Sequence, residues 1–199
     1  TSMASNTTAS NNTAVGYAAL LANTTGADNT AVGKAALDAN TTASFNAAFG
    51  SNALGANTTG SSNTALGISA LTANTTASNN VAVGVNVLAS NTTGTSNTGL
   101  GAFALDSNTT ANNNIAIGHN ALGLNTTGAQ NTAIGVSSLD ANTTADNNTA
   151  VGYNSLSANT TGLNNTAVGR SAGAAVTTAS EATLIGRQAG LSLTTGNSN

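Results

Sequence analysis

The sequence has no cysteine and few charged residues, and each shortage excludes a class of function. Without Cys, neither a disulfide framework nor a thiolate metal site can form. Three Lys/Arg and six Asp/Glu residues give a net charge of −3. The basic surface that neutralises phosphates is therefore missing, and neither nucleic acid nor an anionic membrane is an expected partner. No apolar run approaches the ~18–20 residues of a membrane span, and no signal peptide opens the chain, so this segment is not expected to insert into a membrane.

The residues needed for catalysis are also scarce. His119 is the single histidine, so neither a Ser-His-Asp arrangement nor a His-rich metal site has enough members. Gly33-Lys34 resembles the end of a phosphate-binding loop, but Asp28 stands where that motif needs its first glycine and Ala35 where it needs a hydroxyl. We expect no catalytic, cofactor-binding or metal-binding residues, no cofactor, and no enzymatic activity.

What the sequence does contain is a repeat. Asn-Thr-Ala-Val-Gly begins at Asn12, and full or weaker copies begin every 17 residues at Asn29, Asn46, Asn63, Asn80, Asn97, Asn114, Asn131, Asn148, Asn165 and Ala182. A short fixed period without insertions is typical of a solenoid, in which each unit stacks on its neighbours because it cannot bury a core alone. We number the repeat from this Asn as position 1. Since Met3 occupies the Leu position of a preceding copy, the chain is expected to be an excerpt of a longer fibre.

Position 5 is glycine in every copy. This constancy implies a tight corner with φ > 0 or a close approach of two chains, which other residues would not permit. The predicted structural turn residues are Gly16, Gly33, Gly50, Gly67, Gly84, Gly101, Gly118, Gly135, Gly152, Gly169 and Gly186.

Large apolar residues recur at two positions. Position 4 is always Val, Ile, Leu or Phe, and position 9 is Leu from Leu20 to Leu156. The β-branched residues and the turn residues between short runs predict one strand at positions 1–5 and another at positions 8–10. Positions 4 and 9 are expected to fill the inside of the coil, so replacing Val83 and Val151 with Asp should collapse the stack.

Position 3 is nearly always alanine. Successive residues of a strand point to opposite faces, so the prediction that position 4 points inward places position 3 outside. Small residues kept on the outside indicate a surface where another copy of the coil packs, although Ala could also simply be tolerated beside a flat sheet. The sequence thus predicts self-association along the whole length, most simply about a shared axis.

Positions 12–14 read Asn-Thr-Thr in ten copies. Stacked Asn and Thr side chains can form hydrogen bonds from coil to coil at a turn. Each triplet is also an N-glycosylation acceptor, at Asn6, Asn23, Asn40, Asn57, Asn74, Asn91, Asn108, Asn125, Asn142 and Asn159. A Thr ladder could alternatively bind ice, but adjacent threonines of a strand face opposite sides and leave no two-rank Thr face.

Positions 6, 7, 10, 16 and 17 carry most of the variation and are expected to form an exposed rim. Asp38, Asp106 and Asp140 share position 10 but are never in adjacent copies, so they do not predict a metal site. The last two copies depart from the pattern, with Gly173 and Gly190 at the Leu position. We therefore predict one elongated domain, with regular repeats over 1–164 and a divergent cap or transition over 165–199.

The residues Asn147-Asn148-Thr149-Ala150-Val151-Gly152-Tyr153-Asn154-Ser155 resemble the Asn-Ser-Val-Ala-Ile-Gly-x-x-Ser motif of YadA-like heads in trimeric autotransporter adhesins. Residues 11–16 and 164–169 share its core, and similar repeats occur in phage tail-fibre-like proteins. The resemblance implies a left-handed parallel β-roll assembled as a homotrimer, exposed on a cell or particle surface, that binds host matrix proteins or receptors. The unit is longer than the usual head repeat, so the Asn-Thr-Thr segment must bulge or form a third short strand. A triangular β-helix is the second choice.

Together these observations predict an all-β parallel β-solenoid of about twelve coils of 17 residues. The first functional hypothesis is a segment of an extracellular fibre, either an adhesin head or a tail-fibre-like rod, located at a cell surface or on a virion. The alternatives are a subunit of an open extracellular filament or sheath, and an ice-binding monomeric solenoid.

Overall fold

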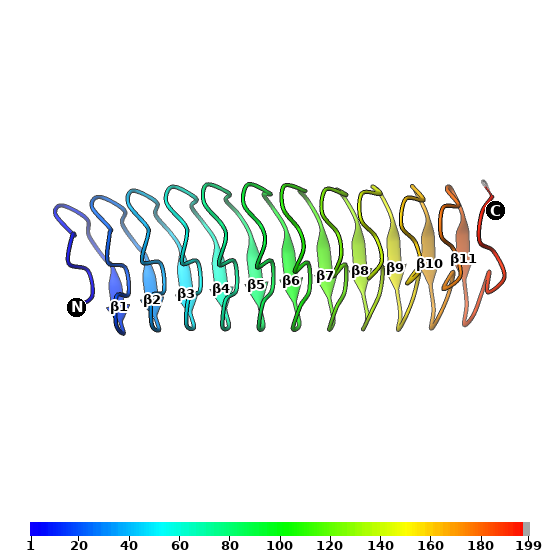
Figure 1. Ribbon diagram of the computed structural model, residues 1–199, viewed down its shortest axis with the longest axis horizontal. Helices are drawn as coiled ribbons and strands as arrows, with labels where there is room; N and C mark the ends of the chain where they lie inside the picture. The colour runs from blue at the N-terminus through cyan, green and yellow to red at the C-terminus, as the bar shows by residue number, and fades with distance from the viewer. Residues whose placement is uncertain (197–199) are drawn as a thin grey trace.

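The chain folds into a parallel β-solenoid in which each repeat makes one coil (Figure 1). The computed structural model describes residues 1–196, and residues 197–199 of the predicted terminal segment lie outside the described part. Each coil contributes one three-residue strand. The strands are β1 (Thr13–Val15), β2 (Thr30–Val32), β3 (Ala47–Phe49), β4 (Thr64–Leu66), β5 (Val81–Val83), β6 (Thr98–Leu100), β7 (Ile115–Ile117), β8 (Thr132–Ile134), β9 (Thr149–Val151), β10 (Thr166–Val168) and β11 (Thr183–Ile185).

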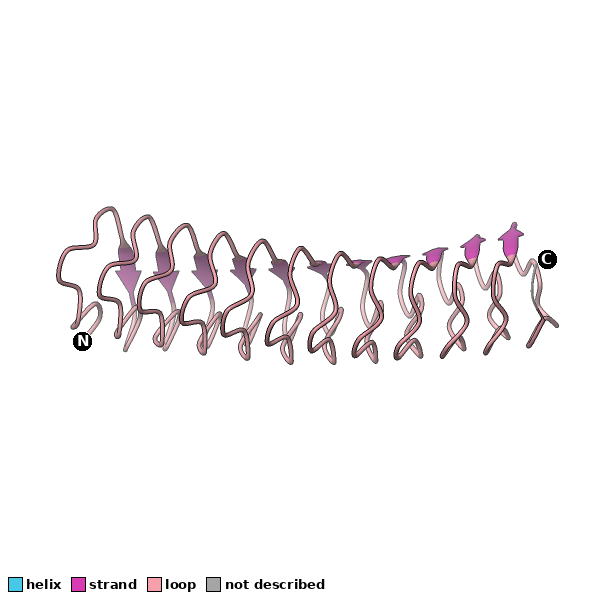
Figure 2. Cartoon of the chain, turned by 90° about the horizontal axis from the view of Figure 1, so that it is seen from above, coloured by secondary structure: helices cyan, strands magenta, loops and turns pink. Residues whose placement is uncertain are grey.

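The eleven strands form one sheet in sequence order from β1 to β11, and every neighbouring pair is parallel. Each residue pairs with the residue at the same repeat position in the next coil, as Thr13 does with Thr30. This register follows from the 17-residue period, which brings the chain back to the same point about ten complete times. The sheet twists along the rod: in Figure 2 the strands point to one side at β1 and to the other side at β11. Within residues 1–196 no helix is long and apolar enough to cross a membrane.

The second strand predicted at positions 8–10 is absent, because the backbone there cannot pleat. Position 7 and position 9 both have positive φ, as at Ala35 (53°) and Leu37 (52°), which is left-handed rather than extended geometry. This half of the coil is nevertheless bonded to the next one. The amide of Leu37 donates to the carbonyl of Ala53 at 3.0 Å, and that of Thr41 donates to Thr58 at 3.1 Å. The loop half is therefore a stacked series of turns with its own ladder of backbone hydrogen bonds.

The predicted orientation of the strand is wrong. The position 3 residues from Ala31 to Ala167 are buried, whereas the large apolar residues at position 4 are half-exposed or exposed, as Leu66 is at 50%. The two positions do point to opposite faces, as the pleat requires. It is the small residue, and not the large one, that faces the interior.

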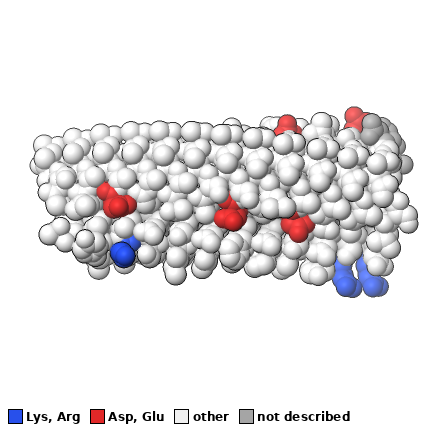
Figure 3. Space-filling model, viewed as in Figure 1, with Lys and Arg blue, Asp and Glu red and all other residues white. Residues whose placement is uncertain are grey.

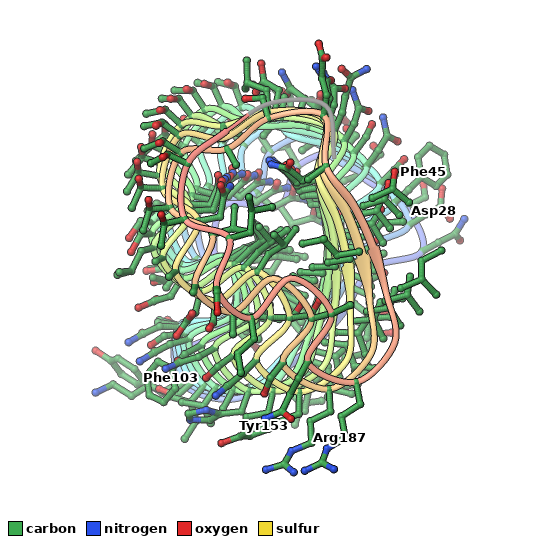
Figure 4. All side chains as sticks on the ribbon, turned by 90° about the vertical axis from the view of Figure 1, so that its right-hand side faces the viewer. Asp28, Phe45, Phe103, Tyr153 and Arg187 are labelled. Carbon is green, nitrogen blue, oxygen red and sulfur yellow. The ribbon has the colours of Figure 1, made fainter. Side chains whose placement is uncertain are left out.

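Two kinds of side chain fill the inside of the rod. The position 9 leucines from Leu20 to Leu156 are all completely buried and stack from coil to coil, as predicted. Beside them run two ladders of asparagine at positions 1 and 12, which Figure 4 shows as a polar row inside the coil. With two amides and a leucine in each coil, little interior volume remains, and this explains why alanine faces inward at position 3.

Departures from the consensus compensate for one another. Val87 replaces the usual Ala at position 8, and the next coil carries Gly99 where Ala is usual at position 3. A Cβ on Gly99 would lie 2.4 Å from Val87 Cγ1. At the C-terminal end the large residue stands at position 3 and the glycines at position 9. Leu184 fills the space beside Gly173 and Gly190, where a Cβ would lie 2.9 and 2.7 Å from the leucine methyl groups. The divergent repeats thus keep the same interior with different residues.

Candidate functional site

The solvent-facing side of the sheet is the most unusual surface of the molecule. Positions 2 and 4 of all strands point outward because position 3 points in. We call these residues the outer sheet face. They are Thr13, Val15, Thr30, Val32, Ala47, Phe49, Thr64, Leu66, Val81, Val83, Thr98, Leu100, Ile115, Ile117, Thr132, Ile134, Thr149, Val151, Thr166, Val168, Thr183 and Ile185. None of them is charged, although a solvated strand face ordinarily carries polar and charged residues.

Two rows of side chains border this face. Position 17 precedes each strand and includes Asp28 and Phe45, while position 6 follows it and includes Tyr153 and Arg187 (Figure 4). The position 6 row holds all three basic residues of the chain, and the position 17 row holds two of its acids. Along position 6, the guanidinium of Arg170 lies 5.9 Å from the centre of the Tyr153 ring in the preceding coil, within the range of a cation–π contact.

The position 5 glycines form the corner after each strand. Their φ angles lie between 117° and 145°, a region that side chains disfavour. The next coil also approaches closely: a Cβ on Gly67 would lie 2.1 Å from the carbonyl oxygen of Gly84. From Gly16 to Gly169 such a Cβ would meet the backbone of the next coil at 3.0 Å or less, whereas a Cβ on Gly186 would meet no atom of the described residues within 4 Å. These glycines permit the close approach of successive coils.

The Asn-Thr-Thr asparagines lie in the interior and not on a rim. From Asn23 to Asn159 they are completely buried, and only Asn6 in the first coil is part-exposed. The amide of Asn74, for example, donates to Asn57 Oδ1 at 2.8 Å and to the Ala77 carbonyl at 3.0 Å. The folded coil therefore has no space for a glycan at the nine buried positions, and glycosylation there would have to precede folding and prevent the ladder from forming.

The second asparagine ladder, at position 1, was not predicted. Asn80 Nδ2 donates to the Gly94 carbonyl at 2.9 Å, and its Oδ1 accepts the amide of Asn97 at 2.9 Å. The Gly94 carbonyl also accepts from Asn91 at 2.9 Å, so it joins the two ladders. No buried side-chain nitrogen or oxygen among residues 1–196 lacks a hydrogen-bond partner. The recurrence of Asn at position 1 was the signal in the sequence that pointed to this ladder.

The threonines of the triplet divide between two roles. The position 13 hydroxyl donates to the carbonyl of the next coil, as Thr58 does to Thr75 at 3.0 Å. Position 14 is exposed, as at Thr59. The hydroxyls of neighbouring positions therefore do not form one flat polar face, as expected from the alternation of side chains.

A shallow hollow opens on the loop side of the rod. Gly123 stands at position 10 between Asp106 and Asp140, and its missing side chain leaves a cavity of about 220 Å³ that Phe103 and Leu124 also line. Burial raises the pKa of both carboxyl groups above the usual value of 3.8, and it does the same for Asp38. These acids lie on separate coils, and no group of three His, Cys, Asp or Glu residues within the described chain could hold a metal ion.

Charged side chains are sparse over the face of the rod that Figure 3 presents. His119 is exposed, and its ring packs edge-on against Phe103 with 5.8 Å between ring centres. Lys34 is also exposed and has no phosphate-loop backbone around it, since it follows Gly33 at the corner of the coil. The structure thus brings none of the titratable residues considered above into a catalytic arrangement.

Comparison with known proteins returns no relative. No protein-family model, no curated protein and no solved structure matches this chain. The functional argument therefore depends on the geometry of the rod and of its outer sheet face.

Proposed function

We propose that this chain is a structural and adhesive segment of an extracellular fibre, assembled as a homotrimer and exposed on a cell or virion surface. The observation that carries the proposal is that buried positions of the coil hold the stack together while exposed positions vary. Hydrogen bonds and leucine packing lock each coil to the next, while the sequence varies mainly at exposed positions. Such a rod provides reach and rigidity, and it presents a repeated surface for attachment.

The winding of the coil agrees with the proposed β-roll. Viewed from the C-terminal end, Phe45, Tyr153 and Phe103 mark successive positions 17, 6 and 7, and they follow one another clockwise (Figure 4). A chain that turns clockwise as it advances toward the viewer winds left-handed. This supports the resemblance to YadA-like heads, in which the roll is left-handed.

Light scattering combined with circular dichroism on the purified chain tests the assembly. Three chains per particle with a β spectrum are expected, and a folded monomer would overturn the trimer. Attachment is tested by retention of matrix proteins such as collagen, or of surface glycans, on the immobilised chain. Because binding would be distributed over repeated coils, no single substitution on positions 6, 7 or 10 should abolish it. Retention of none of these ligands would contradict the adhesive part of the proposal.

Ice binding is the second candidate, and one observation favours it. Thr at position 2 and an apolar residue at position 4 form two outward ranks on the sheet, a regular face that the threonine triplets do not provide. The twist of the sheet in Figure 2 disfavours a match to a flat crystal plane along the whole rod. Ala47, Val81 and Ile115 also interrupt the Thr rank. Thermal hysteresis from a monomer would support this alternative against the fibre.

A further inference from the structure

The outer sheet face exposes a large apolar side chain at position 4 of every strand and mostly threonine at position 2, and it carries no charged residue. Leu66 is 50% exposed, Leu100 44% and Phe49 40%, and no charge interrupts the two outward positions over eleven strands. Ten steps of ~4.8 Å and at most six residue steps of ~3.3 Å give an upper limit of roughly 950 Å² for the face together with its two bordering rows. A standard protein interface, which includes a polar rim, buries about 800 Å² on each partner. The face and its borders are therefore large enough to form an interface.

The period and twist of this face indicate what covers it. Its side chains recur at the spacing of the coils, and its twist accumulates along the rod (Figure 2). A flat membrane or crystal surface cannot follow that twist. Another copy of the same chain has the same spacing and the same twist, so its side chains can pack against this face at every coil.

The charges bordering the face indicate the orientation of the copies. Strand β2 has Asp28 on the position 17 side and Lys34 on the position 6 side, and β11 has Glu181 and Arg187 in the same arrangement. Within one chain the two sides lie six residues apart across the strand, or ~20 Å at 3.3 Å per residue. If copies are related by an axis parallel to the rod, the acidic side of one copy meets the basic side of its neighbour at the same level. An antiparallel pair would instead bring like sides together.

We propose that copies of this chain pack in parallel and in register through the outer sheet face, about an axis parallel to the rod. This inference depends on the assembled fibre proposed above and names its contact surface, which differs from the alanine row predicted from the sequence. Contacts between the apolar side chains at position 4 and the threonine methyl groups at position 2 stabilise the assembly. The pairs Asp28 with Lys34 and Glu181 with Arg187, each formed between neighbouring copies, select the parallel register.

Two matched leucine substitutions test the surface. Leu66→Lys places a charge in the outer sheet face, and Leu124→Lys places it on the loop side, where Leu124 is 57% exposed. In light scattering at equal concentration, Leu66→Lys, or Leu66→Lys with Leu100→Lys, is expected to shift the particle to monomer mass with its β spectrum retained. Leu124→Lys should keep the mass of the parent. A parent that is itself monomeric overturns the assembled fibre, whereas a parent oligomer that Leu66→Lys leaves intact overturns only this contact surface.

Single cysteines test the orientation and remain informative if the lysine variants fail to fold. Because the chain has no cysteine, one introduced thiol gives an unambiguous product with a short thiol-reactive crosslinker. Val32→Cys in β2 should crosslink to itself in the parallel arrangement, while Leu124→Cys should not crosslink. Crosslinking only when Val32→Cys is mixed with Val168→Cys from β10 would show an antiparallel pair and overturn the register. Absence of any product from Val32→Cys and Leu100→Cys in an oligomeric parent would overturn the surface.

Discussion

The packing inside the rod can be tested by replacing Val87 and Gly99, two residues whose sizes complement one another. Val87 at position 8 is completely buried, and Gly99 lies opposite it in the next coil. Most other coils have Ala at both positions. The double replacement Val87→Ala with Gly99→Ala therefore restores the common pair, whereas each single replacement leaves a mismatch.

The expected magnitudes follow from the geometry. Val87→Ala removes two buried methyl groups, which costs about 1.6 kcal/mol of transfer free energy plus a cavity contribution, or about 2–3 kcal/mol in total. Gly99→Ala places a methyl group 2.4 Å from Val87 Cγ1. This overpacking costs about 1–3 kcal/mol, reduced by about 0.5–1 kcal/mol because the unfolded chain loses the freedom of glycine. In the double variant the new methyl fills the cavity, and the net loss should be about 0–1 kcal/mol.

Urea unfolding followed by circular dichroism, at one protein concentration for all four chains, measures this coupling. The two single losses should sum to about 2–5 kcal/mol, so the double variant should be more stable than additivity predicts by about 2–4 kcal/mol. Additive losses would refute the direct contact between positions 8 and 3 of successive coils. They would also count against the inward orientation of position 3 in this coil.

Four further predictions concern the ladders, the corners, the turns and the acidic row. Asn91→Ala removes hydrogen bonds to Asn74 Oδ1 and the Gly94 carbonyl at 3.1 and 2.9 Å. Because buried partners are left unsatisfied, the free energy of unfolding measured by urea titration should fall by about 3–5 kcal/mol. A loss below 1 kcal/mol would contradict the ladder. Gly50→Ala, with φ of 139° and a Cβ 2.3 Å from the next coil's carbonyl oxygen, should cost at least about 3 kcal/mol in the same titration, and a neutral result would refute the close approach. Ala35→Gly relieves a φ of 53° and should stabilise the chain by about 0.5–1 kcal/mol, whereas a destabilised variant would argue against left-handed geometry there. Asp140→Asn should raise the melting temperature at pH 7 but not at pH 3. Burial raises the folded-state pKa of Asp140 above 3.8, so the folded chain binds the proton more tightly and loses stability as pH rises from 3.8 through the folded pKa. An equal change in melting temperature at both pH values would show that desolvation of the charge is not the cause.

Much of the fold could be predicted because the period fixes it. A spacing of 17 residues without insertions requires coils that stack in register, and the structure shows that stacking from β1 to β11. Leu at position 9 was correctly placed in the interior because no other position combines such size with such constancy. These conclusions depend only on recurrence along the chain, and recurrence is visible in a single sequence.

The orientation of the strand could not be read from recurrence alone. Alternation establishes that positions 3 and 4 face opposite ways, but the volume inside the coil decides which of them is buried. That volume is already occupied by Leu37 and by two asparagines, Asn29 and Asn40, in the corresponding coil. From the sequence, Asn40 was expected at a turn and Asn29 in the strand, and neither side chain was assigned to the interior, which left apparent space for the position 4 side chains. The absence of a second strand has a similar origin, since positive φ at leucine is not indicated by residue type.

The exchange of inside and outside changes where an assembly contact can form. Had the alanines faced out, copies would have met through small side chains at a close backbone approach, with little apolar area to bury. With Val, Ile, Leu and Phe outside, each coil instead exposes a large apolar side chain that water solvates poorly. The interior does not need these residues, because the leucine stack and the asparagine ladders already hold the coil together. Their retention on every strand is therefore best explained by a surface that another chain covers.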